Sequence, residues 1–169
     1  MKVEKRTYRV KHNIAPVYDN SSKVLILGSF PSVKSREQCF FYGHPQNRFW
    51  KVISQITESE HPQTVAEKSK MLLGNSIAVW DVVGECDIIG SQDNSILNVV
   101  PNAIDKIIKA SQVKMVFLNG KTAYNLYKKY VADNINIEYR LLPSTSPANA
   151  TWSLSKLIDE WSVLKDYIK

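Results

Sequence analysis

The sequence is poor in cysteine and histidine, the residues from which most metal sites are built. Its two cysteines, Cys39 and Cys86, stand far apart, and no Cys-x-x-Cys pair is present. Two thiols are too few for a disulfide framework or for the four ligands of an iron–sulfur cluster. The three histidines lack the His-x-x-x-His spacing of a zinc site. We therefore expect neither a metal ion nor another cofactor.

Long hydrophobic runs are also missing. No stretch approaches the roughly 20 apolar residues that cross a bilayer, and the charged residues 1–12 lack the apolar core of a secretion signal. We expect no membrane attachment and a cytoplasmic location. The patterns GxxxxGK[ST], GxGxxG and GxSxG are absent, which disfavours nucleoside-triphosphate enzymes, dinucleotide enzymes and α/β-hydrolases.

The length and the composition, with 44% hydrophobic and 22% charged residues, suit one globular domain over residues 1–169. We expect the protein to be a monomer. The 22 Lys and Arg against 16 Asp and Glu give a net charge of +6. A polyanionic partner such as DNA is compatible with this charge. Solvated surface lysines are an equally good explanation.

Four short apolar runs predict buried strands of a parallel sheet that is covered on both faces. They span residues 23–28, 76–80, 113–118 and 137–142. Apolar stripes at helical spacing alternate with them, in residues 49–56, 104–108, 123–130 and 154–168. The alternation predicts the α/β class, as a three-layer α/β/α fold with a short, mainly parallel central sheet of about four strands. Residues 12–22 are expected to form an ordered lead-in loop or an edge strand.

Ligands bind beyond the C-terminal ends of such strands, which singles out three loops. The first joins Gly28-Ser-Phe-Pro-Ser32 to the aromatic-rich segment Phe40–Trp50. Its rings can form a slot for a planar base, and capping of the sheet edge is the competing interpretation. Phe49 and Trp50 begin a helical stripe and are expected in the core. Asn47 directly precedes that helix, so a capping role competes with a functional one.

The other two loops carry groups that suit a phosphate. Leu142-Pro-Ser-Thr-Ser-Pro-Ala-Asn-Ala150 places three hydroxyls and backbone amides before a helix, where an anion is favoured. An ordinary capped turn is the alternative. Asn119-Gly-Lys121 offers an amide, a flexible glycine and a cation. Gly90-Ser-Gln-Asp93 stays open between a loop that contacts a nucleic-acid backbone and a simple turn.

These segments together resemble the uracil-DNA glycosylase superfamily. His44-Pro-Gln-Asn-Arg-Phe-Trp-Lys-Val-Ile53 is similar to a His-Pro-x-Asn-Arg-Phe-Trp segment of the mismatch-specific members, and Gly120-Lys-Thr-Ala-Tyr124 to another. Gly28–Ser32 and Pro143–Ser146 stand in the places of the first and second superfamily motifs. The resemblance covers nearly the whole chain. It implies an enzyme that flips a base out of DNA and hydrolyses its N-glycosidic bond.

One position in the first motif separates the branches. Uracil-specific members have Asp there and mismatch-specific members have Asn, whereas this sequence has Phe30 after Ser29. Gly-Ser-Phe-Pro-Ser resembles instead the hypoxanthine-DNA glycosylase branch, which removes deaminated adenine. The resemblance implies that Asn47 is the catalytic amide and that Tyr42 stacks on the flipped base.

We assign the remaining candidate residues to three groups. Ser29 joins Asn47 as a catalytic candidate. The expected base pocket contains Phe30, Tyr42, His44 and Asn119. The expected contacts to the DNA backbone are Ser32, Lys121, Ser144, Thr145 and Ser146.

Breaking an N-glycosidic bond builds positive charge on the sugar. The Asn47 amide is not a general base, and it can either orient a water or bond the leaving base. Because the first motif has no Asp, we expect no carboxylate-activated water and slower chemistry than in uracil-specific enzymes. No lysine matches a Schiff-base position, which predicts a monofunctional enzyme.

The favoured hypothesis is removal of hypoxanthine from DNA. Excision of uracil opposite guanine keeps the same chemistry, but the residue at Phe30 argues against it. A non-enzymatic protein that binds damaged DNA would use the same charge and rings. A small-molecule-binding α/β domain accounts for the fold pattern and leaves the combination of loops unexplained.

Overall fold

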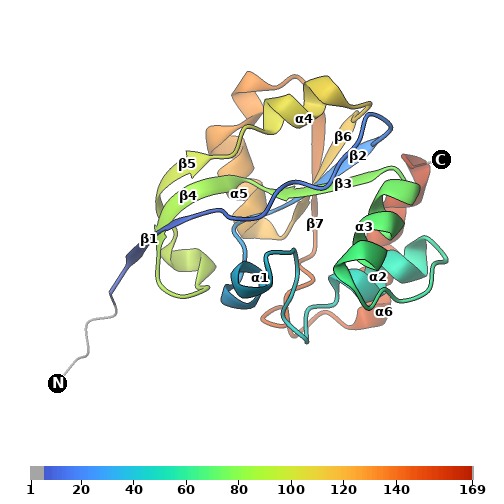
Figure 1. Cartoon of the computed structure of the whole chain (residues 1–169), viewed down its shortest axis with the longest axis horizontal. Coiled ribbons are helices and arrows are strands. Elements are labelled where there is room, and N and C mark those ends of the chain that lie inside the picture. The colour runs from blue at the N-terminus through green and yellow to red at the C-terminus, as the bar shows by residue number, and fades with distance from the viewer. Residues whose placement is uncertain (1–5, 169) are drawn as a thin grey trace.

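The computed structural model describes residues 6–168. Its central sheet has four parallel strands in the order β3-β2-β6-β7 (Figure 1). These strands are β2 (Val24–Gly28), β3 (Ile77–Asp81), β6 (Met115–Asn119) and β7 (Glu138–Leu142). They coincide with the four predicted runs to within two residues at either end, so the prediction of a short parallel sheet is confirmed.

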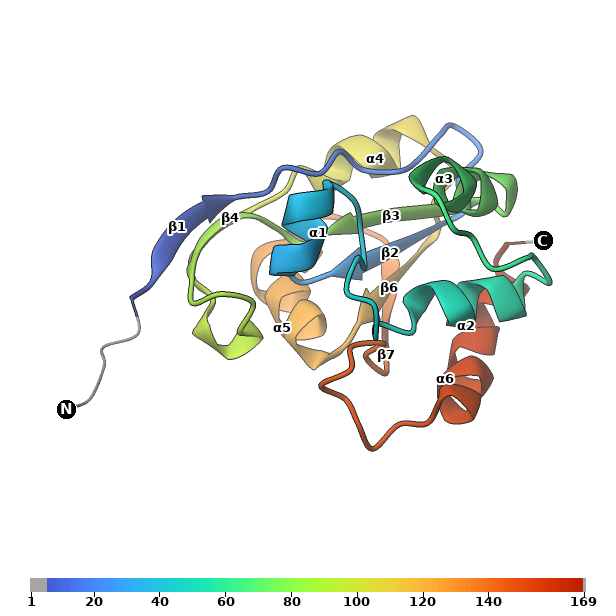
Figure 2. The same cartoon turned by 60° about the horizontal axis from the view of Figure 1, so that its bottom comes forward.

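Helices cover both faces of this sheet, as Figure 2 shows. Along β2, Val24 and Ile26 pack against one group of helices, while Leu25 and Leu27 pack against the other. The first group contains α2 (Phe49–Ile56), α3 (Val65–Gly74) and α6 (Leu154–Trp161). The second contains α4 (Ile104–Ala110) and α5 (Lys121–Tyr130). The predicted three-layer α/β/α fold is therefore confirmed.

A second, antiparallel sheet was not predicted. Its order is β1-β4-β5, made by β1 (Tyr8–Lys11), β4 (Val83–Ile88) and β5 (Leu97–Pro101). It extends to one side of the parallel sheet (Figure 1). Most residues of β1 and β5 are exposed. The sequence of β1, Tyr-Arg-Val-Lys, has no apolar run, whereas β5, Leu-Asn-Val-Val-Pro, is apolar in sequence although Leu97 and Val100 are exposed. The inward face of β4 is apolar and packs on Phe30.

The lead-in segment and several short elements complete the chain. Residues 12–22 run as a loop along the sheet edge, where Val17 forms an isolated antiparallel bridge with Val79. The short helix α1 (Val33–Gln38) was not predicted, and neither was α3. Single 3-10 turns occur at η1 (Asp93–Ser95), η2 (Ala132–Asn134) and η3 (Ser162–Asp166).

No helix within residues 6–168 is both long and apolar enough to cross a membrane. Cys39 is exposed and Cys86 is buried, and both are free thiols. Across the same residues, no group of three or more His, Cys, Asp or Glu side chains could hold a metal ion. The predicted domain, residues 1–169, extends at both ends beyond the described residues.

Candidate active site

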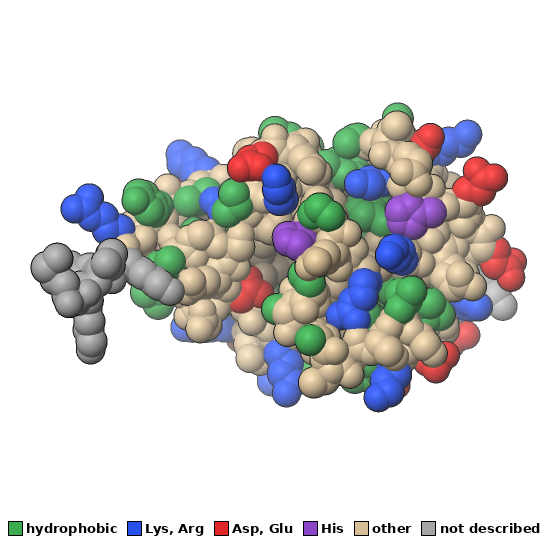
Figure 3. All heavy atoms as spheres, turned by 90° about the horizontal axis from the view of Figure 1, so that it is seen from below, with side chains coloured by type: hydrophobic (Ala, Val, Ile, Leu, Met, Phe, Trp, Pro, Cys, Tyr) green, Lys and Arg blue, Asp and Glu red, His purple; other side chains and the backbone are tan. Residues whose placement is uncertain are grey.

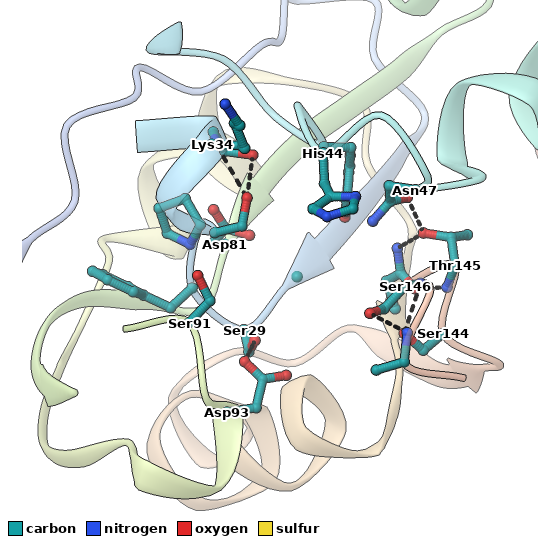
Figure 4. A pocket seen from close by; sticks show the side chains of 18 of the residues that line it. Ser29, Lys34, His44, Asn47, Asp81, Ser91, Asp93, Ser144, Thr145 and Ser146 are labelled. Carbon is teal, nitrogen blue, oxygen red and sulfur yellow. Dashed lines mark hydrogen bonds between the residues drawn. The ribbon is translucent and has the colours of Figure 1, made fainter. Parts of the chain in front are cut away.

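The loops after the parallel strands surround a pocket of about 620 Å3 (Figure 4). Three residues at the strand ends line it: Gly28 of β2, Asp81 of β3 and Asn119 of β6. All three loops singled out from the sequence contribute to its wall, as do α1 and residues 91–94. The pocket therefore lies beyond the C-terminal ends of the strands, where ligands bind in open α/β sheets.

The Asn47 amide is held in one orientation. Its Oδ1 accepts hydrogen bonds from the backbone N–H of Phe49 at 3.0 Å and from Thr145 Oγ1 at 2.8 Å. Because a backbone N–H can only donate, these contacts identify the oxygen and leave Nδ2 as the outward group. Figure 4 shows Asn47 at the pocket wall with its nitrogen directed inward. The oxygen thus accepts the first N–H of α2, as the capping interpretation predicts, while the nitrogen faces the pocket.

Thr145 links this amide to the sheet. The hydroxyl of Thr145 is buried and accepts from Asn119 Nδ2 at 3.1 Å while donating to Asn47 Oδ1. The Thr145 backbone N–H donates to Asn119 Oδ1 at 3.0 Å. Asn119 therefore uses one N–H and its side-chain oxygen to hold the loop at Thr145. Thr145, predicted to contact the DNA backbone, is placed as an internal support instead.

Arg48 fastens the loop of residues 143–152 to the start of α2. Its guanidinium donates to the carbonyl oxygens of Ser146 and Asn149, each at 3.1 Å, and to that of Trp152. The backbone N–H of Arg48 also donates to Thr145 O at 3.1 Å. The loop that was predicted to clamp a phosphate is thus held by side chains of the aromatic-rich segment.

Ser29 forms a hydrogen bond with a carboxylate that lies far from it in the sequence. Its hydroxyl donates to Asp93 Oδ1 at 2.9 Å, across 64 residues of chain. Burial of the carboxyl group raises the pKa of Asp93, and the nearby charge of Asp81 adds to this rise while the Ser29 hydrogen bond opposes it. Asp93 lies in Gly90-Ser-Gln-Asp93, the segment whose role was open, and residues 91–94 line the pocket.

A second carboxylate, Asp81, also lines the pocket. Its Oδ2 accepts from His12 Nε2 at 2.8 Å, and the two side chains are only 5% and 3% exposed. The expectation that no carboxylate could activate a water rested on the first motif alone. The fold overturns that premise, because strand β3 and the 90–94 loop bring two carboxylates to the place where the motif has none.

The predicted base pocket contains a platform of rings. Tyr42 stacks on Phe49 with ring centroids 4.0 Å apart, which covers one face of its ring. Burial, with the charge of Asp81, raises the pKa of Tyr42, so its hydroxyl stays neutral. Phe30 is buried and lines the pocket. His44 lines it too, and its Nδ1 accepts from Gln46 N at 3.1 Å, which leaves Nε2 as the donor.

The hydroxyls proposed for the DNA backbone lie along the rim. Ser32, Ser144 and Ser146 line the pocket, and each accepts a local backbone N–H that shapes its own turn. Lys121 is exposed at the start of α5 and does not line the pocket. Figure 3 shows Lys and Arg side chains scattered over one face of the molecule rather than gathered in a single patch.

The sequence did not lead us to assign a role in the site to four residues: His12, Arg48, Asp81 and Asp93. Arg48 stands inside the segment His44–Ile53, which could have drawn notice to it. Asp81 directly follows a predicted strand, and a polar residue at a strand end is a usable signal. Asp93 lies in the segment Gly90–Asp93, whose role the sequence left open, and His12 lies in a segment with no local mark of function.

Comparison with known proteins agrees with the geometry. The profile of the uracil DNA glycosylase superfamily matches residues 15–166. A protein of Methanosarcina acetivorans named hypoxanthine DNA glycosylase is 30% identical over 157 residues, which is 92% of this chain and 98% of that protein. A protein of the same name from Methanosarcina barkeri is 32% identical over 143 residues, which is 82% of this chain and 88% of that one.

A solved structure is also similar. A solution NMR structure from Methanosarcina acetivorans, provisionally described as a uracil DNA glycosylase, superposes with a TM-score of 0.79. The identity is 29%, and the match covers 91% of this chain and 95% of that one.

Proposed function

The chain belongs to the uracil DNA glycosylase superfamily, and we propose that it is a monofunctional DNA glycosylase that removes deaminated bases, hypoxanthine above all, from DNA. The observation that carries this proposal is the Asn47 amide, fixed with its N–H toward a pocket that a ring platform borders. The names of the two relatives support hypoxanthine as the base.

Asn47 acts on the leaving base. Its oxygen is occupied twice, so the side chain offers only a donor to the pocket. A donor stabilises the negative charge that the base acquires as the bond between C1′ and the base nitrogen breaks. The same donor cannot take a proton from a water. Of the two roles that the sequence left open, contact with the base is the one we propose.

Ser29 and Asp93 hold the attacking water. The Ser29 hydroxyl donates its hydrogen bond to Asp93, so the Ser29 oxygen and the second carboxylate oxygen of Asp93 can accept hydrogen bonds from a water. The water oxygen bonds to C1′, the bonding electron pair leaves with the base, and the proton of the water passes to Asp93. A raised pKa makes this carboxylate a better proton acceptor than an ordinary aspartate.

The rest of the pocket positions the nucleotide. The open face of Tyr42 stacks on the flipped base, because Phe49 already covers the other face. Ser32, Ser144 and Ser146, which line the pocket, contact the flanking phosphates together with Lys121, whose chain neighbour Gly120 lies against Ser144. The monomeric state and the cytoplasmic location stay predictions, and light scattering of the purified protein tests the first.

The decisive experiment replaces Asn47 by Asp. This change keeps the oxygen that accepts from Phe49 N–H and from Thr145, and it replaces the donating NH2 group by a charged oxygen that can only accept. We expect the single-turnover rate on an inosine duplex, read as alkaline strand cleavage, to fall about 100- to 1000-fold. Asn125→Asp on the exposed side of α5 is the matched control and should retain the wild-type rate.

The same assay separates the alternatives. Faster cleavage of a uracil–guanine duplex than of an inosine duplex would replace hypoxanthine by uracil as the substrate. Tight binding without an abasic product, even at stoichiometric protein, would reject an enzyme in favour of a DNA-binding protein. An unchanged rate for Asn47→Asp would reject the role of the amide.

A further inference from the structure

The pocket contains an acceptor that the proposed hydrolysis does not use. The Asp81 carboxylate can only accept hydrogen bonds, and its Oδ2 accepts one from His12. Within residues 6–168 its Oδ1 forms no hydrogen bond, although the side chain lines the pocket. We propose, on the premise that the chain is a glycosylase for deaminated bases, that Asp81 Oδ1 accepts the N1–H of hypoxanthine and thereby excludes adenine.

The acceptor is rigid because His12 has one available tautomer. The backbone N–H of Ile14 donates to His12 Nδ1 at 3.2 Å, so the ring proton resides on Nε2 and is donated to Asp81. The rings of Phe30, Phe41 and Trp80 surround the imidazole, with centroids 6.1 to 6.2 Å away. His12 is therefore a positioning residue for Asp81.

Asp81 lies beside the ring platform. A Cβ at Gly28 would be 2.4 Å from Asp81 Oδ1 and 3.3 Å from Tyr42 Oη, so both atoms border the same strand end. A purine stacked on the open face of Tyr42 turns one edge toward Asp81. In Figure 4, Asp81 and Asn47 lie on different sides of the pocket, so the two contact different edges of the base.

The chemistry of deamination matches this acceptor. Hypoxanthine carries a hydrogen on N1, whereas adenine presents a lone pair there. An ionised carboxylate only accepts, so it bonds hypoxanthine and repels the adenine lone pair. Sites built to bond one hydrogen reject analogues without it by about 10,000-fold or more. Guanine also has N1–H, so Asp81 distinguishes deaminated adenine from adenine alone, and the 2-amino group of guanine must be excluded elsewhere.

The first test replaces Asp81 by Asn. His12 still presents its N–H, so the amide oxygen turns to His12 and an N–H group takes the place of Oδ1. We expect the affinity ratio of hypoxanthine over adenine to fall at least about 100-fold, with slower but measurable inosine cleavage. The ratio is measured on duplexes whose 2′-fluoro nucleotide resists hydrolysis. Asp105→Asn on α4, exposed and outside the pocket, is the matched control.

The second test uses the wild-type protein, so it does not depend on the folding of a variant. N1-methylhypoxanthine has no N1–H and pairs poorly, which by itself favours extrusion. We expect its cleavage to be at least about 100-fold slower than that of hypoxanthine. In D81N the methyl group should cause little additional loss, because both changes remove the same contact. Additive losses, or an unchanged affinity ratio in D81N, would overturn the proposal.

Variants of His12 provide a third test. His12→Ala should lower the hypoxanthine-over-adenine ratio, and His12→Gln should restore part of it, because a glutamine amide can donate to Asp81. A purely structural role would lower the thermal midpoint and leave the ratio unchanged. If the wild-type protein cleaves no deaminated base, the proposed function fails. If it cleaves inosine while D81N keeps its preference, only the inference about Asp81 fails.

Discussion

Thr145 helps to fix the orientation of the Asn47 amide, for which we propose the catalytic role. Thr145→Val keeps the shape and removes the hydroxyl, so Asn119 Nδ2 loses a buried acceptor and Asn47 Oδ1 keeps only the Phe49 amide. An unsatisfied buried group costs about 1–3 kcal/mol. We expect the single-turnover rate to fall about 5- to 100-fold with little change in affinity for undamaged DNA. Thr145→Ser, which keeps the hydroxyl, should retain most of the rate; equal rates for the two variants would contradict this role.

Asp93 couples stability to pH. Its raised pKa means that the folded protein binds this proton more tightly than the unfolded chain. The contribution of Asp93 to stability therefore falls as the pH rises from the ordinary carboxyl value to the raised one, and it stays unfavourable at neutral pH. Asp93→Asn should raise the thermal midpoint at pH 7, leave it nearly unchanged at pH 3, and slow cleavage.

Asp87 provides the opposite control for that measurement. Its hydrogen bond from Asn98, followed by contacts with Arg9, lowers its pKa, so its stabilising contribution is present at neutral pH and lost on acidification. Asp87→Asn should lower the thermal midpoint slightly at pH 7. A rise for both variants would show that loss of charge in general, rather than the pocket, governs the effect.

At the scale of elements, Arg48 joins helix α2 to the loop of residues 143–152. Its planar fork donates to three carbonyl oxygens, a geometry that lysine cannot reproduce. We expect Arg48→Lys to make this loop more sensitive to limited proteolysis and to weaken DNA binding several-fold. Arg140→Lys on the exposed side of β7 is the control. Equal proteolysis of the two variants would indicate that other contacts hold the loop.

At the scale of the whole molecule, the net charge of +6 predicts binding to DNA that weakens with salt. The logarithm of the binding constant should fall linearly with the logarithm of the salt concentration, with a slope of about −0.9 for each phosphate contacted. Lys121→Gln should make the slope shallower by about one and weaken damaged and undamaged duplexes alike.

Lys109→Gln is the control for that charge effect. Lys109 lies in the last turn of α4, which leads to the N-terminal end of β6 and so to the edge of the sheet opposite the pocket, and it forms an ion pair with Asp105 at 3.5 Å. Lys109→Gln should leave the slope of the salt dependence unchanged. An equal change for both lysines would assign the salt dependence to overall charge rather than to contacts beside the pocket.

The elements that could be predicted are those with a local pattern. The buried runs of β2, β3, β6 and β7 and the apolar stripes of α2, α4, α5 and α6 each repeat at the period of their structure. The strands β1 and β5 are short and exposed, and the pairing of β1 with β4 joins residues almost 80 positions apart in the sequence. Helix α3 had a usable signal, since Thr64 and Glu67 form a capping box.

The sequence by itself determined the layer order and the edge of the sheet where the pocket lies. It also marked Asn47, Tyr42 and the hydroxyl loop, because motif and strand end are local properties. Only the tertiary structure decided which atom of Asn47 faces the pocket and which carboxylates join it. Asp81 pairs with His12 across 69 residues, and Asp93 with Ser29 across 64. Such pairs depend on how strands and loops pack, and no spacing along the chain encodes them.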